Sequence, residues 1–304
     1  MINFKKAYIV EIYRNRPFGD DEPYIKIVSD QTNMLRVAFK VRKSNSVYQS
    51  GNTMQLSIYN LSQGTRSQIN DFNDYVILRA GWFGKTLPII YQGSSISVNH
   101  RISPPNAITQ INCLDESASL IALTNTNPKI SVNSNISIRS LVENIAKYYR
   151  LSVAVNEIPI ESILQSGYSS SDKSIKEVLS DLANRADCSI SIVDSKIYIY
   201  KTSDSELPRG YIDISEENGM IGYPQKYGYN PANPVLNLGK SRLRPSMWRV
   251  ETQLNGNINI FSGTRLFCPA LKINGQEGLV ISLEHNCDTH GGSWKTILDT
   301  YEKL

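Results

Sequence analysis

The densest group of potential metal ligands lies near the C-terminus of the chain. Four candidate zinc ligands fall within a six-residue stretch: His285, Cys287, Asp288 and His290. Their H-x-C-x-x-H spacing comes from one short stretch, and no second half-site of Cys or His accompanies it. The same residues suit a β-hairpin in which the turn starts at Asp288 and Gly291-Gly292 supply positive φ. The sequence favours the hairpin, so no metal and no other cofactor is expected.

Residues for nucleophilic or acid-base catalysis are present but are not paired by any motif. The chain has no G-x-S-x-G, and its serine-rich stretches, Gly93-Ser94-Ser95 and Gly167 to Ser171, suit polar loops. A glycosidase would need two placed carboxylates, and the candidates are Glu161, Asp181, Glu284 and Asp299. No P-loop or G-x-G-x-x-G follows a strand. We therefore predict that the protein is not an enzyme and has no catalytic residues.

Charge and composition exclude several partner classes. The net charge of +4 is small and spread along the chain, so no sequence-specific nucleic-acid partner is expected. The basic run Lys240 to Arg249 is interpreted as an exposed connector, although it could touch phosphates or an acidic partner. No apolar run reaches the ~20 residues of a membrane helix, and the N-terminus lacks a secretion signal. The four cysteines are widely spaced and are predicted to be buried free thiols.

Strand patterns dominate the first part of the chain and return in the last part. Alternating apolar residues predict strands at 6–13, 34–41, 53–59, 75–80, 89–98 and 107–114, with a short helix capped by Ser62. After a loop-like segment, strands are predicted at 247–254, 257–261, 264–268, 278–286 and 294–301. Asn255-Gly256 and Asn274-Gly275 are predicted to form I′ hairpin turns. Such short, regularly spaced strands favour antiparallel barrels or sandwiches.

The middle of the chain, 116–204, has a different pattern. Apolar residues at helical spacing predict one amphipathic helix from Ile138 and a second from Ile175, each opened by Ser-Ile-basic. A β run follows each helix, at Leu151–Val155 and Ser189–Val193, and the two units are offset by 37 residues. A hairpin turn at Asp194-Ser195 then leads into the alternating strand 196–200. These features predict an α+β insert with a single internal duplication.

Several motifs in this order resemble the phage tail and baseplate hub proteins of contractile-tailed phages, a family related to the hub part of type VI secretion spike proteins. In the first part the resemblance rests on Leu56 to Ser62, the Ala80-Gly81-Trp82 strand and Tyr91-Gln92-Gly93. In the last part it rests on Gly219 to Pro224, on Ile281 to Asp288, and on His290 to Thr296. Together these motifs cover most of the chain.

The resemblance implies a fold and an assembly. It implies two similar antiparallel tube-type β-barrels, 1–115 and 205–304, flanking the α+β insert 116–204. It further implies a homotrimer whose pseudo-six-fold ring joins a hexameric tail tube to a trimeric central spike in the virion, assembled in the host cytoplasm. Tube protein and spike protein are then partners, with the tape measure protein and other baseplate subunits as further candidates. No membrane partner is expected.

Two other functions stay open from the sequence. A carbohydrate- or surface-binding β module of a phage tail would need exposed aromatics beside carboxamides. The 17 tyrosines, against 7 phenylalanines, suit surfaces buried between subunits, but strand propensity explains them equally well. A peptidoglycan hydrolase would need the catalytic pairing that the sequence lacks. A third alternative keeps the hub fold and the structural role, but places the protein in a type VI secretion system or a related contractile apparatus.

Overall fold

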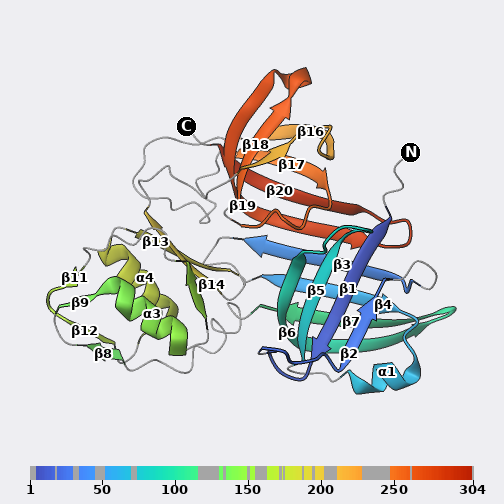
Figure 1. Cartoon of the computed structure of the whole chain (residues 1–304), viewed down its shortest axis with the longest axis horizontal. Coiled ribbons are helices and arrows are strands. Elements are labelled where there is room, and N and C mark those ends of the chain that lie inside the picture. Colours follow the sequence, from blue (N-terminus) through green and yellow to red (C-terminus); the bar gives the residue numbers. More distant parts are fainter. Residues whose placement is uncertain are drawn as a thin grey trace.

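The computed structural model shows a mainly β chain with a small helical insert (Figure 1). The described residues are 5–17, 19–29, 34–44, 52–69, 74–115, 130–132, 135–148, 151–154, 163–170, 173, 175–186, 188–193, 196–201, 211–227, 247–260 and 262–302. Their dominant feature is one 13-stranded sheet with the order β16-β17-β20-β19-β3-β4-β7-β6-β5-β1-β2, to which β15 and β18 are added beside β19.

The N-terminal half of this sheet is an antiparallel set of strands folded around one core. Its elements are β1 Lys6–Tyr13, β2 Ile25–Val28, β3 Val37–Ser44, β4 Thr53–Tyr59, α1 Gln63–Gln68, β5 Tyr75–Trp82, β6 Ile89–Ser103 and β7 Asn106–Leu114. Alternate residues of β3 and β4 are buried, as strict period-2 alternation predicts. Ser62 caps α1 by accepting a hydrogen bond from the backbone N–H of Thr65, 3.0 Å away, so the predicted cap is confirmed.

The C-terminal half uses β15 Tyr211–Ile214, β16 Met220–Tyr227, β17 Met247–Gln253, β18 Gly263–Cys268, the 3-10 turn η2 Pro269–Leu271, β19 Ile273–Asp288 and β20 Trp294–Glu302. Its own core contains Val250, Leu266 and Leu298 among others. Strand β19 belongs to both halves of the sheet. It pairs with β18 and β20, and its last seven residues pair with β3.

The two halves of the sheet have the same strand order. The N-terminal half runs β3-β4-β7-β6-β5-β1, and the C-terminal half runs β16-β17-β20-β19-β18-β15. Each pairing in the first series has its counterpart in the second, at the same place in the chain. One pairing differs in direction, because β1 and β5 are antiparallel whereas β15 and β18 are parallel. The halves are therefore topological counterparts.

The insert forms a separate α/β unit beside the large sheet (Figure 1). It contains β8 Ile130–Val132, β9 Ile136–Ser137, α3 Ile138–Tyr148, β10 Ser152–Ala154, β11 Ile163–Leu164, β12 Tyr168–Ser170, α4 Ile175–Arg185, β13 Cys188–Val193 and β14 Lys196–Lys201. Both predicted helices are confirmed, and their apolar stripes share one core. The two predicted β runs flank β14, one parallel to it and one antiparallel. The predicted turn at Asp194-Ser195 lies outside the described residues.

Three local predictions in the C-terminal half are wrong. Residues 257–260 form no strand, because Asn255 and Asn259 accept hydrogen bonds from nearby backbone N–H groups, and residue 261 of the predicted strand 257–261 lies outside the described residues. Ile258 and Ile260 are nevertheless buried, which imitates strand alternation. Residues Asn255-Gly256 lack the positive φ of a I′ turn. The loop-like segment that was expected from Pro224 onward begins inside strand β16, which extends to Tyr227, and residues 228–246 lie outside the described residues.

The β18–β19 turn also differs from the prediction. Residues Pro269–Leu271 make it, and Lys272 adopts a left-handed conformation with φ 56°. Asn274-Gly275 instead lies inside β19, where the register shifts opposite Leu266 and Phe267 and Gly275 has φ 75°. A glycine with positive φ there produces a bulge, because only Gly adopts that conformation freely. The strand β2, which the sequence analysis missed, is a four-residue edge strand.

Candidate assembly interface

The joint between the two halves is the candidate site, because two segments far apart in the sequence form one ladder there. Strand β3 pairs antiparallel with β19 from Ser44 opposite Ser282 to Ala38 opposite Asp288. Period-2 alternation sends one set of these side chains into the core and the other to the outer face of the sheet. His285 and Cys287 are on the core side, whereas Glu284 and Asp288 are on the outer side.

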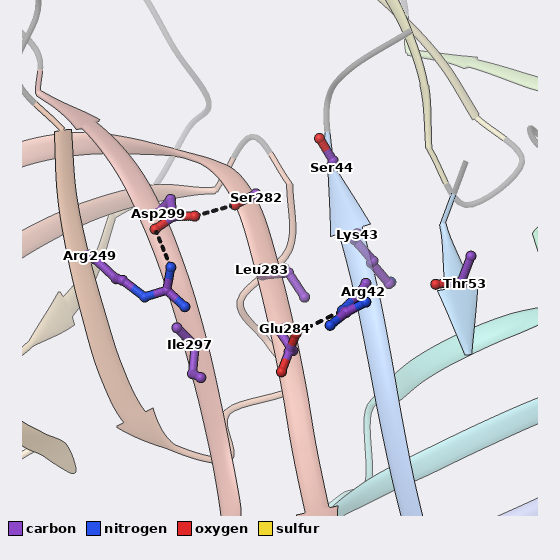
Figure 2. A pocket seen from close by; sticks show the side chains of 10 residues that line it. All are labelled: Arg42, Lys43, Ser44, Thr53, Arg249, Ser282, Leu283, Glu284, Ile297 and Asp299. Atoms are coloured by element: carbon purple, nitrogen blue, oxygen red, sulfur yellow. Dashed lines mark hydrogen bonds and ion pairs between the residues drawn. The ribbon is translucent and has the colours of Figure 1, made fainter. Parts of the chain in front are cut away.

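Ion pairs cross the joint on its outer face (Figure 2). The Glu284 carboxylate accepts a hydrogen bond from Arg42 at 2.8 Å, which Figure 2 shows. It accepts another from Lys40 at 2.9 Å. Four residues further along β19, on the same face, Asp288 binds the Arg36 guanidinium through both oxygens, at 2.7 and 3.2 Å. These contacts join strand β19 of the C-terminal half to the strand β3 segment of the N-terminal half. They fix the register of the shared ladder, since a slip by one residue would turn every side chain to the other face.

The electrostatics of these carboxylates follow from their partners. Burial alone would raise the pKa of Glu284, but the hydrogen bonds from Arg42 and Lys40 outweigh burial and lower it. For Asp288 burial again acts upward, and the Arg36 guanidinium and the backbone N–H of His290 lower the pKa overall. Both groups are therefore ionised at neutral pH, as ion-pair partners require.

A cavity of about 670 Å³ lies at this joint and is drawn in Figure 2. Its floor includes a second ion pair, in which Arg249 approaches Asp299 at 3.9 Å and Ser282 donates a hydrogen bond of 2.6 Å to the same carboxylate. Glu284 and Asp299, two candidates for glycosidase chemistry, both line this cavity. Glycosidic general acids have a raised pKa, whereas the pKa of Glu284 is lowered.

A tryptophan anchors the joint from the other end of β20. Trp294 is 6% exposed, and its ring meets those of Phe39 and Trp82 edge to face at 5.6 and 6.5 Å. Its indole N–H donates to the carbonyl of Gly81 at 3.2 Å, and the Trp82 indole donates to the carbonyl of Leu254 at the same distance. Together with Leu254 and Cys287, Trp294 completes the core of the N-terminal half. The C-terminal half thus supplies part of its neighbour's interior.

The suggested zinc ligands do not converge. His285 is buried, its Nδ1 lies 2.9 Å from the Thr296 hydroxyl, and burial together with the charge of Lys43 lowers its pKa to about 3. Asp288 points to the opposite face, and His290 contacts Thr289 in the turn. Within the described ranges no cluster of three or more His, Cys, Asp or Glu could hold a metal ion. Gly291 has the expected positive φ, but Gly292 does not.

The remaining candidates are scattered. Ser94 and Ser95 lie inside β6, not in the predicted loop, and Asp181 on α4 is paired with Lys173 and Arg185. Glu161 and residues 240–246 of the basic run lie outside the described residues. The cysteines Cys113, Cys268 and Cys287 are free and buried, as predicted. Sequence reasoning missed Trp294, Arg36 and the β3–β19 pairing, although His290 to Thr296 had been noted as a motif.

Solved structures show to which class this fold belongs. The chain is similar to the 43 kDa tail protein of prophage MuSo2 from Shewanella oneidensis, with a TM-score of 0.61, 10% identity and 97% of each chain covered. A tail protein from Neisseria meningitidis MC58 gives a TM-score of 0.62 with the same identity and coverage. The E. coli c3393 protein, a component of the type VI secretion system, gives 0.52 at 9% identity, covering 90% of this chain and 76% of that one. The fold is that of phage tail proteins.

The family is defined more narrowly. A family model described as baseplate hub gp41 matches residues 25–259, which is most of the chain. The protein therefore belongs to the baseplate hub gp41 family, and the suspected relationship to phage tail and baseplate hubs is confirmed. No curated protein sequence matches the chain. No helix in the described part of the chain is long and apolar enough to cross a membrane.

Proposed function

We propose that the protein is a structural, non-enzymatic hub subunit whose three copies form a pseudo-six-fold ring in the tail baseplate. In this ring each half of the chain closes as a tube-type barrel and occupies one of six positions. The ring joins a hexameric tail tube to a trimeric central spike, and the protein acts in the virion after assembly in the host cytoplasm. Other baseplate subunits are its natural neighbours.

The single observation that supports this proposal most strongly is the repeated strand order of the two halves. Hexameric and trimeric rings have different symmetries, and a protein that contacts both must present six similar surfaces from three chains. A chain with two topologically equivalent halves meets that requirement. The β3–β19 ladder adds rigidity, because the halves are joined by backbone hydrogen bonds and by aromatic contacts of Trp294.

A mechanical role also fits the character of the joint. The carboxylates at the cavity are paired with the guanidinium groups of arginine side chains, and these contacts hold neighbouring strands together. Exposed ion pairs contribute little stability individually, so they act mainly by fixing register, whereas the buried Trp294 supplies the larger part of the free energy. We therefore assign the joint to load transfer between halves.

Light scattering on the purified full-length chain tests the oligomeric state, and a cell-wall degradation assay tests the absence of enzymatic activity. The proposal predicts a particle of three times 34.1 kDa, with no release of soluble peptidoglycan fragments. Glu284→Gln with Asp299→Asn is the matched control for hydrolysis. Turnover by the natural chain that these changes abolish would overturn the non-enzymatic assignment. A chain that stays monomeric at all concentrations, alone or with tube and spike proteins, would overturn the ring.

A further inference from the structure

The correspondence between the two halves extends to single residues of β6 and β19. Ser94 pairs with the start of β5 and the end of β7, as Leu279 pairs with the start of β18 and the end of β20. Each strand has a register irregularity at two matching places, near Ile90 and Ile96 in β6 and near Gly275 and Ile281 in β19. Ser103 therefore corresponds to Asp288, at the same offset of 185 residues.

Side-chain contacts follow the same correspondence. His285 on β19 and His100 on β6 are equivalent, and so are their threonine partners on the next strand. The Nδ1 atom of His285 is 2.9 Å from the hydroxyl oxygen of Thr296, and that of His100 is 3.1 Å from that of Thr109. Two of the three histidines in the chain thus make the same contact in the two halves.

The equivalent strands differ in what covers them. The last part of β19 is covered by β3, whereas no strand among the described residues pairs with Ser97–Ser103 on the corresponding edge of β6. Burial reflects this difference. Cys287 is 2% exposed, but its counterpart Ile102 is 74% exposed, and His100 is exposed whereas His285 is 1% exposed. This edge of β6 is equivalent to the edge of β19 that β3 covers, but no described strand pairs with it.

The counterpart of β3 is β16, which is the edge strand at one end of the sheet. Strand β16 pairs with β17 as β3 pairs with β4, so Gln225 corresponds to Lys40 and Ile221 to Ala38. Within the described part of the chain β16 has β17 as its one partner strand. It carries exposed apolar side chains on its free edge segment, with Ile221 42% and Tyr223 64% exposed. Open edges of this kind are templates for pairing with another chain.

We infer that β16 of one copy pairs antiparallel with Ser97–Ser103 of β6 in the next copy, repeating between chains the β3–β19 ladder found within each chain. The inference rests on the proposed ring and specifies its contact between subunits. Transferring the register places Gln225 opposite Arg101, as Lys40 is opposite Asn286, and Ile221 opposite Ser103, as Ala38 is opposite Asp288. In a ring of three chains, the β3–β19 ladder within each chain would alternate with the β16–β6 ladder between chains. Neither the β16 edge nor the β6 edge would then remain unpaired.

Cysteine cross-linking of the full-length chain tests this register. In a Cys188→Ser background, Gln225→Cys with Arg101→Cys places two thiols on directly opposed residues, within the reach of a disulfide. Oxidation is expected to convert the protein to a covalent trimer that reduction returns to single chains. Mixing the two single variants should give covalent dimers and nothing larger, because each supplies half of one contact.

Two matched variants control the experiment. Lys40→Cys with Asn286→Cys occupies the equivalent positions of the internal ladder and should close within one chain, as peptide mapping would show. Gln225→Cys with Gln55→Cys should not cross-link, because β4 is about three strand spacings, roughly 14 Å, from the predicted position of β16. A particle that is trimeric by light scattering but does not cross-link, while the internal control closes, would overturn the pairing and leave the ring intact. A chain that remains monomeric would overturn both.

Discussion

Replacing Trp294 by alanine should loosen the joint between the two halves more than any single truncation on the β3–β19 ladder. The side chain is 6% exposed, packs edge to face on Phe39 and Trp82, and donates a hydrogen bond to Gly81. Truncating a buried Trp typically costs about 3–5 kcal/mol. Of this, roughly 1 kcal/mol comes from each aromatic contact and a similar amount from the hydrogen bond.

Urea denaturation gives the total loss, and hydrogen exchange measured by mass spectrometry shows its location. We expect Trp294→Ala to lower the free energy of unfolding by about 3–5 kcal/mol. Exchange should accelerate in β3 and in the last part of β19, where the two halves meet. Trp248→Ala is the matched control, since Trp248 is 9% exposed within the core of the C-terminal half and its indole N–H has no partner in the described part of the chain.

The control should accelerate exchange in β16 and β17 and leave β3 protected. Two results would refute the reasoning. In one, Trp294→Ala costs less than about 1 kcal/mol, which is the range of an ordinary surface change. In the other, both substitutions accelerate exchange in β3 equally, which would mean that the joint does not depend on the contacts of Trp294.

Three further predictions concern single residues. Arg42→Ala should cost under about 1 kcal/mol in urea denaturation, because the Arg42 side chain is 64% exposed and its ion pair with Glu284 is screened; a loss above about 2 kcal/mol would contradict this. The His285 pKa lies near 3 when folded and 6.5 when unfolded, so the unfolded chain binds the extra proton. The contribution of neutral His285 to the free energy of unfolding should be fully present above pH 6.5. The free energy of unfolding should fall by about 3–5 kcal/mol towards pH 3, and His285→Gln should flatten this dependence. Gly93→Ala should cost about 1–3 kcal/mol in thermal unfolding, because its Cβ would lie 2.4 Å from the Leu114 carbonyl oxygen, whereas Gly84→Ala tests positive φ alone, with open space around it.

The spacing of apolar residues in the sequence predicted the regular strands and helices. Alternation identified β1 and β4 to the residue, and helical spacing identified α3 and α4. Turns were harder, because a turn depends on which group satisfies each backbone N–H. Asn255 and Asn259 bind backbone N–H groups directly, and their stretch imitates a strand by burying Ile258 and Ile260.

The candidate site could be predicted only in part. The motif around Trp294 was visible in the sequence, but its partners Phe39 and Trp82 lie more than 200 residues away. The β3–β19 ladder depends on long-range register, which no local pattern encodes. The equivalence of His100 and His285 could not be found by spacing alone, because β6 and β19 share little sequence beyond the histidine and its preceding bulge.

Electron cryo-microscopy of the purified, assembled protein tests the central claim most directly. We expect a ring of three chains in which six similar β modules surround one axis, with the N-terminal and C-terminal halves alternating and superposing strand for strand. A ring of six chains, or a trimer in which one half of each chain lies outside the ring, would contradict the account.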